Sequence, residues 1–270
     1  MKLKKNNNIQ LKIGFYLLLL IILLVLIAYI YWDFPIQINM DQRLKPWSDQ
    51  FPLGTDDLGR DFLSSVIYGI FNSLMIGFFV VLFSSFSGVV LGLISGFAGG
   101  VIDTIIMRVV DIILSFPGIL MAIALISFLN SNVFCLIGIL TFSGWVSYAR
   151  IIRGEVLKYK NLEFILAARS YNASFFRIIF FHFPPIILPL VIVQAFMGMG
   201  EVILVESSLN FLGIGLGPEI PTLGQLIDVG RGHLFDRPGL VMVPGMVIFL
   251  LILSFNLIGE GLRKYYNRYL

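Results

Sequence analysis

The chain has 270 residues, of which 58% are hydrophobic and 13% are charged, with a net charge of +3 and a mean hydropathy of +0.92. Soluble domains carry roughly 25% charged residues, so this chain has too few charges to cover a water-exposed surface and is not an ordinary soluble protein. Nucleic-acid binding is not indicated either, because most of the basic residues flank apolar stretches. We therefore expect a single all-α bundle that is integral to a membrane.

The N-terminal segment contains the first candidate span. Four lysines lie within the first 12 residues, and an apolar run of 20 residues follows them, Ile13–Trp32. The run is longer than the core of a typical signal peptide, and no small-x-small cleavage site follows it. We expect residues 1–12 to be cytoplasmic and residues 13–32 to remain as a transmembrane helix.

A spanning helix needs about 20 mostly apolar residues, and five further stretches meet this requirement. These stretches are Ser73–Ala98, Val109–Leu129, Val133–Ile152, Ile186–Val205 and Leu240–Gly259. They predict a five-helix core over residues 73–259, preceded by an extracytoplasmic segment at 33–72 and followed by a cytoplasmic tail at 260–270. The core includes a cytoplasmic loop at 153–185 and an outer loop at 206–239, and both are long enough to hold extra short helices.

Small residues mark one face of the second predicted span. Gly88, Gly92 and Gly96 recur every four residues and therefore share a face of the helix. Small side chains let helices approach closely in lipid, where no hydrophobic drive favours their association. We expect this stripe to pack against a neighbouring helix, and the alternative is that it lines a pore.

The distribution of Lys and Arg orients the predicted spans, because cytoplasmic loops carry an excess of these residues. With the N-terminus inside, 14 of the 19 basic residues lie on the inner side. The outer side then holds Arg43, Lys45, Arg60, Arg231 and Arg237. The sequence thus predicts a multi-pass protein of the cytoplasmic (cell) membrane with both termini in the cytoplasm.

Several kinds of chemistry lack their residues in this chain. There is no G-x-x-x-x-G-K-[ST] phosphate loop and no H-E-x-x-H motif, and two histidines with one cysteine make a metal site improbable. We expect no enzyme activity, cofactor or metal site in this chain. Ion-coupled carriers place carboxylates deep within their spans, whereas Asp111, Glu201 and Glu206 lie near predicted span ends. We expect Glu201 to reach the outer interface.

The predicted cytoplasmic loop is the most informative segment. Ala167–Arg169 predicts a compact helix, and Asn172 can supply the turn or C-cap that follows it. Arg177–His182 predicts a second amphipathic piece, which Pro184 and Pro185 end before the next span. A helix–turn–helix on the cytoplasmic face is suited to docking into a groove of a partner protein.

This loop resembles the permease subunits of bacterial binding-protein-dependent ABC importers. Their signature has Glu-Ala-Ala, then Gly after three intervening residues, and an Ile-x-Leu-Pro-like close. Ala167 and Ala168 match the alanines and Leu188-Pro189 matches the close, whereas Leu166 replaces the Glu and Asn172 replaces the Gly. The resemblance implies a contact with an ATPase by the residues Glu163, Ala167, Ala168, Arg169, Asn172, Arg177 and Pro185.

Other stretches are similar to the dipeptide, oligopeptide and nickel branch of this family, and to its C-type subunit. These are Phe51–Asp61, Asp103–Arg108 with Asp111 and Pro117, Glu206–Gly215, Pro238-Gly239 and Phe255–Arg263. The resemblance implies a type I permease fold of six transmembrane helices with a cytoplasmic coupling helix. It also implies four partners besides the lipid bilayer: a second homologous permease, two cytoplasmic ABC ATPases that hold ATP and Mg²⁺, and an extracytoplasmic solute-binding protein.

Two further groups of residues receive expected roles. The resemblance implies that Glu206, Asn210, Gly213 and Gly215 form an outer gate or contact the binding protein. Arg108 and Asp111 are spaced i,i+3 and are expected to form a structural ion pair. For residues 53–60 the plain alternative is a surface turn with glycines and an Asp cap, and His182 and His233 are expected to be structural.

The function that the resemblance implies is import of di- or oligopeptides across the cytoplasmic membrane by alternating access, driven by ATP in the partner subunits. Import of nickel or a metal chelate by the same mechanism is the alternative within the family. A stand-alone carrier or a membrane scaffold subunit without transport activity is the alternative from another class.

Overall fold

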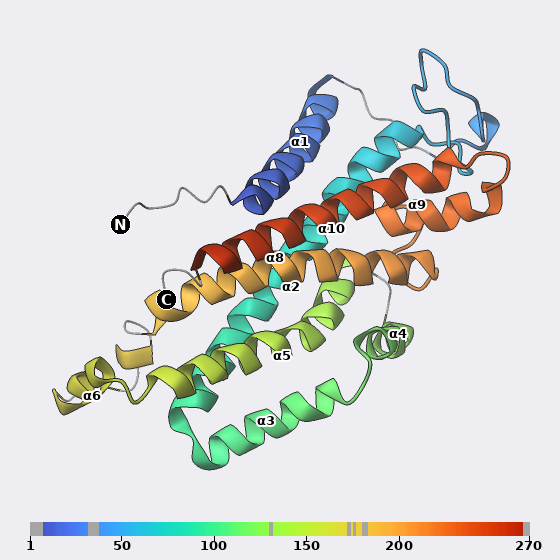
Figure 1. Cartoon of the computed structure of the whole chain (residues 1–270). Coiled ribbons are helices and arrows are strands. Elements are labelled where there is room, and N and C mark those ends of the chain that lie inside the picture. The colour runs from blue at the N-terminus through green and yellow to red at the C-terminus, as the bar shows by residue number, and fades with distance from the viewer. Residues whose placement is uncertain are drawn as a thin grey trace, which may run out of the picture.

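The computed structural model describes residues 8–31, 38–129, 132–171, 174, 177–179 and 183–266. Within these residues every regular element is a helix, apart from one isolated antiparallel bridge between Thr55 and Asp61. The long helices lie side by side in an elongated bundle (Figure 1). The all-α membrane architecture predicted from the sequence is therefore confirmed.

Helix α1 (Ile9–Tyr31) lies on one flank of the bundle against α10 (Gly239–Tyr266). Asn8 Nδ2 donates to the carbonyl oxygen of Gly261 at 2.9 Å, so the start of α1 lies beside the end of α10. Gly261 permits this approach, because a Cβ at that position would lie 2.6 Å from Leu11 Cβ. Most other α1 side chains are exposed and apolar, as expected of a helix that faces lipid tails.

Helices α2 (Phe62–Ala98) and α5 (Val133–Tyr159) form the tightest pair of the bundle. The stripe of Gly88, Gly92 and Gly96 faces α5, and a Cβ on each would lie 2.4, 2.7 and 2.7 Å from α5 atoms. The two backbones therefore touch where the side chains are absent. The predicted close-packing stripe is confirmed.

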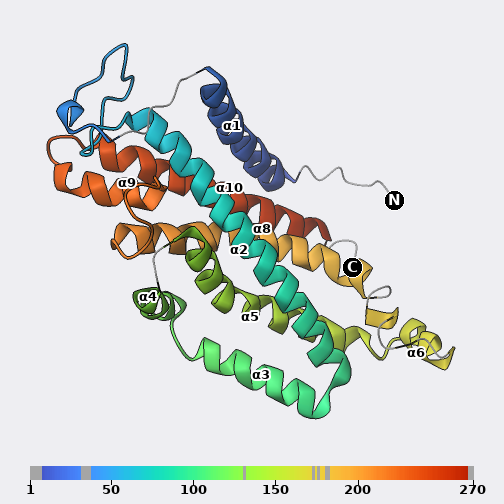
Figure 2. The ribbon, with the colours of Figure 1, turned by 180° about the vertical axis from the view of Figure 1, so that it is seen from behind.

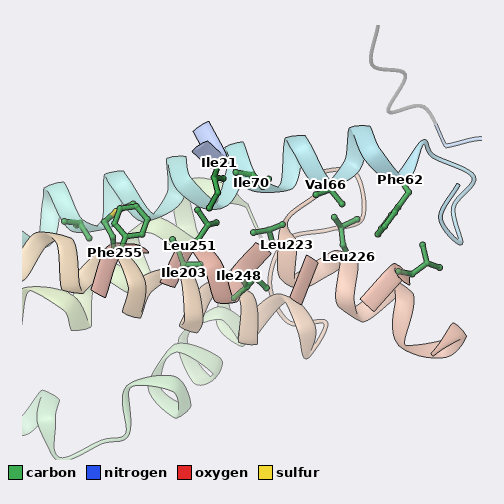
Figure 3. Close-up of a cluster of buried hydrophobic side chains, with 13 residues drawn as sticks. Ile21, Phe62, Val66, Ile70, Ile203, Leu223, Leu226, Ile248, Leu251 and Phe255 are labelled. Atoms are coloured by element: carbon green, nitrogen blue, oxygen red, sulfur yellow. The ribbon is translucent and has the colours of Figure 1, made fainter. Parts of the chain in front are cut away.

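Helix α8 (Pro184–Phe211) packs with α2 and α10 around a cluster of buried side chains (Figure 3). The short helix α9 (Leu223–Gly230) closes one end of this cluster with Leu223 and Leu226. The other short elements are the two 3₁₀ turns η1 (Met40–Gln42) and η3 (Arg231–His233), and helix α6 (Glu163–Ser170). Both long breaks between the predicted spans therefore contain short helices, as expected.

The predicted third span, Val109–Leu129, is wrong as a single straight helix. The structure has α3 (Gly100–Leu114) and α4 (Gly118–Phe128), bent by 87° relative to each other. Pro117 has no backbone N–H and restricts the conformation of Phe116, so the helix ends before it. Among the described residues five helices are long and apolar enough to cross a membrane, and the bent pair is the sixth candidate.

The helices are longer than the apolar stretches that predict them. Helix α2 begins at Phe62 because Asp61 caps it by accepting from Ser64 N at 3.0 Å. Helix α8 begins at Pro184, since proline suits the first turn of a helix, and it continues beyond Val205 to Phe211. Hydropathy locates the lipid-facing part of a helix, whereas capping residues set its ends.

The two ends of the bundle carry different segments (Figures 1 and 2). One end has the start of α1, the last turn of α10, α6 and the end of α2. The other end has the segment 38–61, which we call the outer segment, together with α9 and η3. This arrangement places the described parts of the segments predicted to be cytoplasmic at one end and the described parts of those predicted to be extracytoplasmic at the other.

Candidate functional site

A cavity of about 300 Å³ lies among α2, α3, α4, α5 and α8. Its wall is mostly apolar, but several polar side chains open onto it. These are Ser84 of α2, Ser143, Ser147 and Tyr148 of α5, and Gln194 and Glu201 of α8. A partly polar cavity bounded by spanning helices is a candidate translocation pathway, because groups of this kind can replace part of a solute's hydration shell.

Small residues make room for the polar side chains of this cavity. A Cβ on Gly144 would lie 2.5 Å from Ser84 Oγ, so α2 and α5 approach each other across a hydroxyl. A Cβ on Gly198 would lie 3.0 Å from the Tyr148 hydroxyl. That hydroxyl donates to the carbonyl oxygen of Gln194 at 3.4 Å, which joins α5 to α8.

Glu201 lies well before the end of α8. Because α8 continues to Phe211, Glu201 lies ten residues, or about 15 Å along the helix axis, before its end. Its side chain is exposed and lines the cavity. Glu201 is therefore part of the long apolar helix α8, and it faces the cavity.

Glu206 lies in a polar joint between α8 and α2 and is fully buried. Ser73 Oγ of α2 donates to Glu206 Oε2 at 3.1 Å, and Asn210 Nδ2 donates to Oε1 at 2.7 Å. Ser207 Oγ is a further partner at 3.3 Å. Glu206 is therefore held within the bundle in this conformation and is not available on the surface.

Asn210 fixes the start of the outer loop that follows α8. Its Oδ1 accepts from Leu216 N at 2.6 Å, and a Cβ on Gly215 would lie 2.2 Å from the same oxygen. Gly213 has a φ of +72°, which favours glycine, and its backbone is exposed. Of the four residues predicted to form an outer gate or to contact the binding protein, only Gly213 is exposed, and the others shape the loop from within.

Arg60 fastens the outer segment to this loop and also forms a buried ion pair within the segment. Arg60 Nε lies 2.7 Å from Asp56 Oδ2, and both side chains are almost fully buried. Arg60 Nη1 also donates to the carbonyl oxygen of Pro218 at 2.8 Å. Gly54 and Gly59 have positive φ, so the glycine turn is present, but Thr55, Asp56 and Arg60 are buried, whereas the plain interpretation placed this turn on the surface. Sequence reasoning missed the ion pair because nothing local indicates its burial.

Asp57 joins the outer segment to η3. Its Oδ1 lies 2.7 Å from Arg43 Nε and 2.8 Å from His233 Nε2. Burial opposes ionisation of Asp57, but hydrogen bonds and charges from Arg43 and His233 outweigh it and lower the pKa of the carboxyl below its ordinary 3.8. This contact agrees with the structural role expected for His233, whereas His182 lies outside the described residues.

Helix α6 is seated on the ends of the spanning helices. Ile165 is fully buried in a cluster with Phe183 and Ile178 from the segment before α8. The same cluster includes Val156 of α5 and Leu93 of α2. A force applied to α6 would therefore reach α2, α5 and α8 through direct packing.

The residues predicted to contact an ATPase lie on or near α6. Glu163 and Ala167 on the helix, and Arg177 and Pro185 beyond it, are exposed. Ala168 and Arg169 belong to α6, but their side chains lie outside the described part of the structure, as does all of Asn172.

The predicted pair of Arg108 with Asp111 is not among the ion pairs of the described residues. Asp111 Oδ1 instead lies 3.4 Å from Arg150 Nη2 of α5, and both side chains are exposed. A closer pair that sequence reasoning missed joins Asp103 of α3 to Arg153 of α5 through two hydrogen bonds of 2.6 and 2.7 Å. Two parallel bonds of this kind fix orientation as well as distance.

Comparison with known proteins identifies the family. The model described as "binding-protein-dependent transport system inner membrane component" matches residues 88–269, about two thirds of the chain. The chain belongs to this family. The matched region contains α6, the outer loop, and the α5 and α8 walls of the cavity. Members of this permease family are membrane transport components rather than enzymes, and the resemblance found in the sequence is confirmed.

Individual relatives are similar over most of their length. A dipeptide transport system permease protein of Alkalihalophilus pseudofirmus is 35% identical over 84% of this chain and 75% of its own. A dipeptide transport system permease protein of Haemophilus influenzae is 39% identical over 78% of this chain and 72% of its own length. A glutathione transport system permease protein of Salmonella typhimurium is 38% identical over 86% of this chain and 75% of its own length.

Proposed function

We propose that this permease is one half of the membrane pathway of an ATP-driven importer for di- or oligopeptides. Family membership supplies the transport role, and the substrate class rests on relatives named for dipeptide and glutathione transport, since glutathione is itself a small peptide. The cavity among α2 to α5 and α8 agrees with this role. No observation favours nickel import or a stand-alone carrier.

The partners proposed are a second related permease, two cytoplasmic ATPases that bind ATP and Mg²⁺, and an extracytoplasmic binding protein. The ATPases would dock on the exposed face of α6. Closure of the ATPase pair would move α6, and the packing of Ile165 and Phe183 would carry this movement to the spanning helices. Solute would then pass inward without any change in its bonds.

The orientation proposed places α6 and both termini in the cytoplasm. The excess of Lys and Arg at that end supports it, as does the contact between the start of α1 and the end of α10. The outer segment and the loop between α8 and α9 would then face the binding protein. Glu206, Asn210 and Arg60 would hold that docking face in shape rather than touch the binding protein themselves.

The test is to isolate the permease with its partners. A C-terminal affinity tag, mild detergent and mass spectrometry of the purified material should recover a second permease and one or two ATPases with Walker motifs. Recovery of this chain alone or as a homo-oligomer, under conditions in which a control importer stays intact, would contradict the assignment.

A further inference from the structure

Glu201 is the starting point, because a carboxylate within a spanning helix needs a reason. The side chain lies about 15 Å inside the end of α8 and lines the cavity. Among the described residues it has no hydrogen bond and no ion pair. Carboxylates within spanning segments are costly and mark a path for ions or substrates when they face a cavity.

The surroundings of Glu201 provide acceptors and no competing cation. The cavity wall contains no Lys, Arg or His within the described residues. Ser84 is almost fully buried and its Oγ has no hydrogen-bond partner in the described part of the chain. The carbonyl oxygen of Gln194 receives the Tyr148 hydroxyl. The cavity therefore presents the carboxylate of Glu201 and the exposed hydroxyl of Ser147, both of which can accept from a positively charged donor.

We infer that Glu201 forms a cation-selective subsite that binds the ammonium group of a peptide during its passage through the permease. An ammonium group has three donors, and its bond to a carboxylate is about twice as strong as a neutral one. A volume of about 300 Å³ is at the small end of ligand pockets, which suits a short peptide. The peptide substrate in this inference rests on the proposed function, whereas the cation selectivity of the cavity is independent of it.

The selectivity can be measured with a single cysteine in the cavity. In a Cys135→Ser background, Ser147→Cys places a thiol on the α5 wall, where Ser147 is exposed. The intact importer complex is then treated with cationic trimethylammonium-ethyl methanethiosulfonate and, separately, with the anionic sulfonato-ethyl reagent. The negative charge of Glu201 should favour the cationic reagent, and Glu201→Gln should lower the ratio of the two rates about tenfold.

Glu260→Gln in the same background is the matched control. Glu260 lies near the far end of α10 beside Arg263 and Lys264, so removing its charge should leave the ratio unchanged. If Glu201→Gln left the ratio unchanged as well, for example because a cation from the second permease already neutralised Glu201, the inference would be overturned.

Peptide probes identify the cation. Alanyl-alanine should slow modification of Ser147→Cys by a neutral thiol reagent, and N-acetyl-alanyl-alanine should protect at least fivefold less. N-acetyl-alanyl-lysine has no α-ammonium group but keeps the ammonium group of its lysine side chain. Its comparison with alanyl-alanine shows which of the two ammonium groups binds, and protection by either peptide supports an ammonium site. Equal protection by the acetylated and the free alanyl dipeptide would refute the ammonium assignment. A complex with the predicted charge selectivity but no peptide uptake would instead refute the proposed function.

Discussion

At the residue scale, the outer end of the bundle depends on polar side chains that are satisfied by partners distant in the sequence. Glu206 meets Ser73, 133 positions away, and Arg60 meets Pro218, 158 positions away. Sequence reasoning assigned Glu206 to an outer gate or a contact with the binding protein and could not predict its burial, because this burial depends on the packing of α2 against α8. It also paired Asp111 with its nearest basic neighbour on the same helix face, whereas the partner is Arg150 on another helix.

Because Glu206 is held by hydrogen bonds, we expect the stability of the protein to depend on the size and polarity of this side chain more than on its charge. Glu206→Ala leaves the Ser73 hydroxyl without its partner in a buried joint and removes one of the two acceptors of Asn210 Nδ2, and each unsatisfied group costs about 1–3 kcal/mol. Glu206→Gln retains an acceptor oxygen and should cost less. The melting midpoint of the purified protein, followed by tryptophan fluorescence, should therefore fall further for the alanine variant. Equal midpoints for the two variants would contradict the joint.

Asp57 predicts an acid dependence for the outer end. Its pKa is lowered in the folded protein, so its contribution to stability is present above about pH 3.8 and is lost as pH falls through the folded value. Asp57→Asn should melt at a lower temperature than the unsubstituted protein at pH 5, and the two should converge as pH falls below 3.8. A difference that stayed constant from pH 5 to 2.5 would show that the Asp57 charge contributes nothing.

At the element scale, the pairing of α2 with α5 and the seating of α6 matter most. The glycine stripe was predictable from sequence because its four-residue period is visible in the chain itself. The bend between α3 and α4 was not predicted, because hydropathy averages over a window and passes across Ser115–Pro117. The ends of α2 and α8 were missed for a similar reason, since Asp61 and Pro184 act through backbone geometry rather than hydropathy.

Gly92 tests the α2–α5 contact. A Cβ there would lie 2.7 Å from the carbonyl oxygen of Ala149, so Gly92→Ala should destabilise the protein by about 1–3 kcal/mol through overpacking. Gly138 of α5 is the matched control, because nothing lies within 4 Å of its added Cβ. Gly138→Ala should be neutral or slightly stabilising in thermal melting. An equal effect of both variants would argue against backbone contact.

Ala167 tests the role of α6. Its side chain is exposed, so Ala167→Glu should leave the melting midpoint unchanged while placing a charge on the proposed ATPase contact. We expect loss of the ATPases on copurification and a decrease in ATP-driven uptake of at least tenfold. Ala167→Ser, which stays small, should keep both. Normal uptake by Ala167→Glu in an intact complex would show that the ATPases dock elsewhere.

At the scale of the whole molecule, composition and the apolar stretches were sufficient to predict a membrane bundle and its approximate spans, whereas its family was predicted from the resemblance of short motifs to known permeases. Those features are local or cumulative and need no tertiary contact. The cavity was not predictable in the same way, because Ser84, Ser147 and Glu201 come from three helices. The place of Glu201 within α8 was not predictable either, because it depends on where the helix ends.

The central claim is that this permease moves peptides by using ATP hydrolysed in its partners. The most direct measurement is uptake of radiolabelled alanyl-alanine into lipid vesicles that contain the complete importer, with binding protein outside and ATP inside. We predict accumulation above the external concentration that requires ATP and stops when the ATPases carry an inactivating Walker-motif substitution. Uptake by the permease alone, or none by a complete complex that hydrolyses ATP in response to loaded binding protein, would contradict this account.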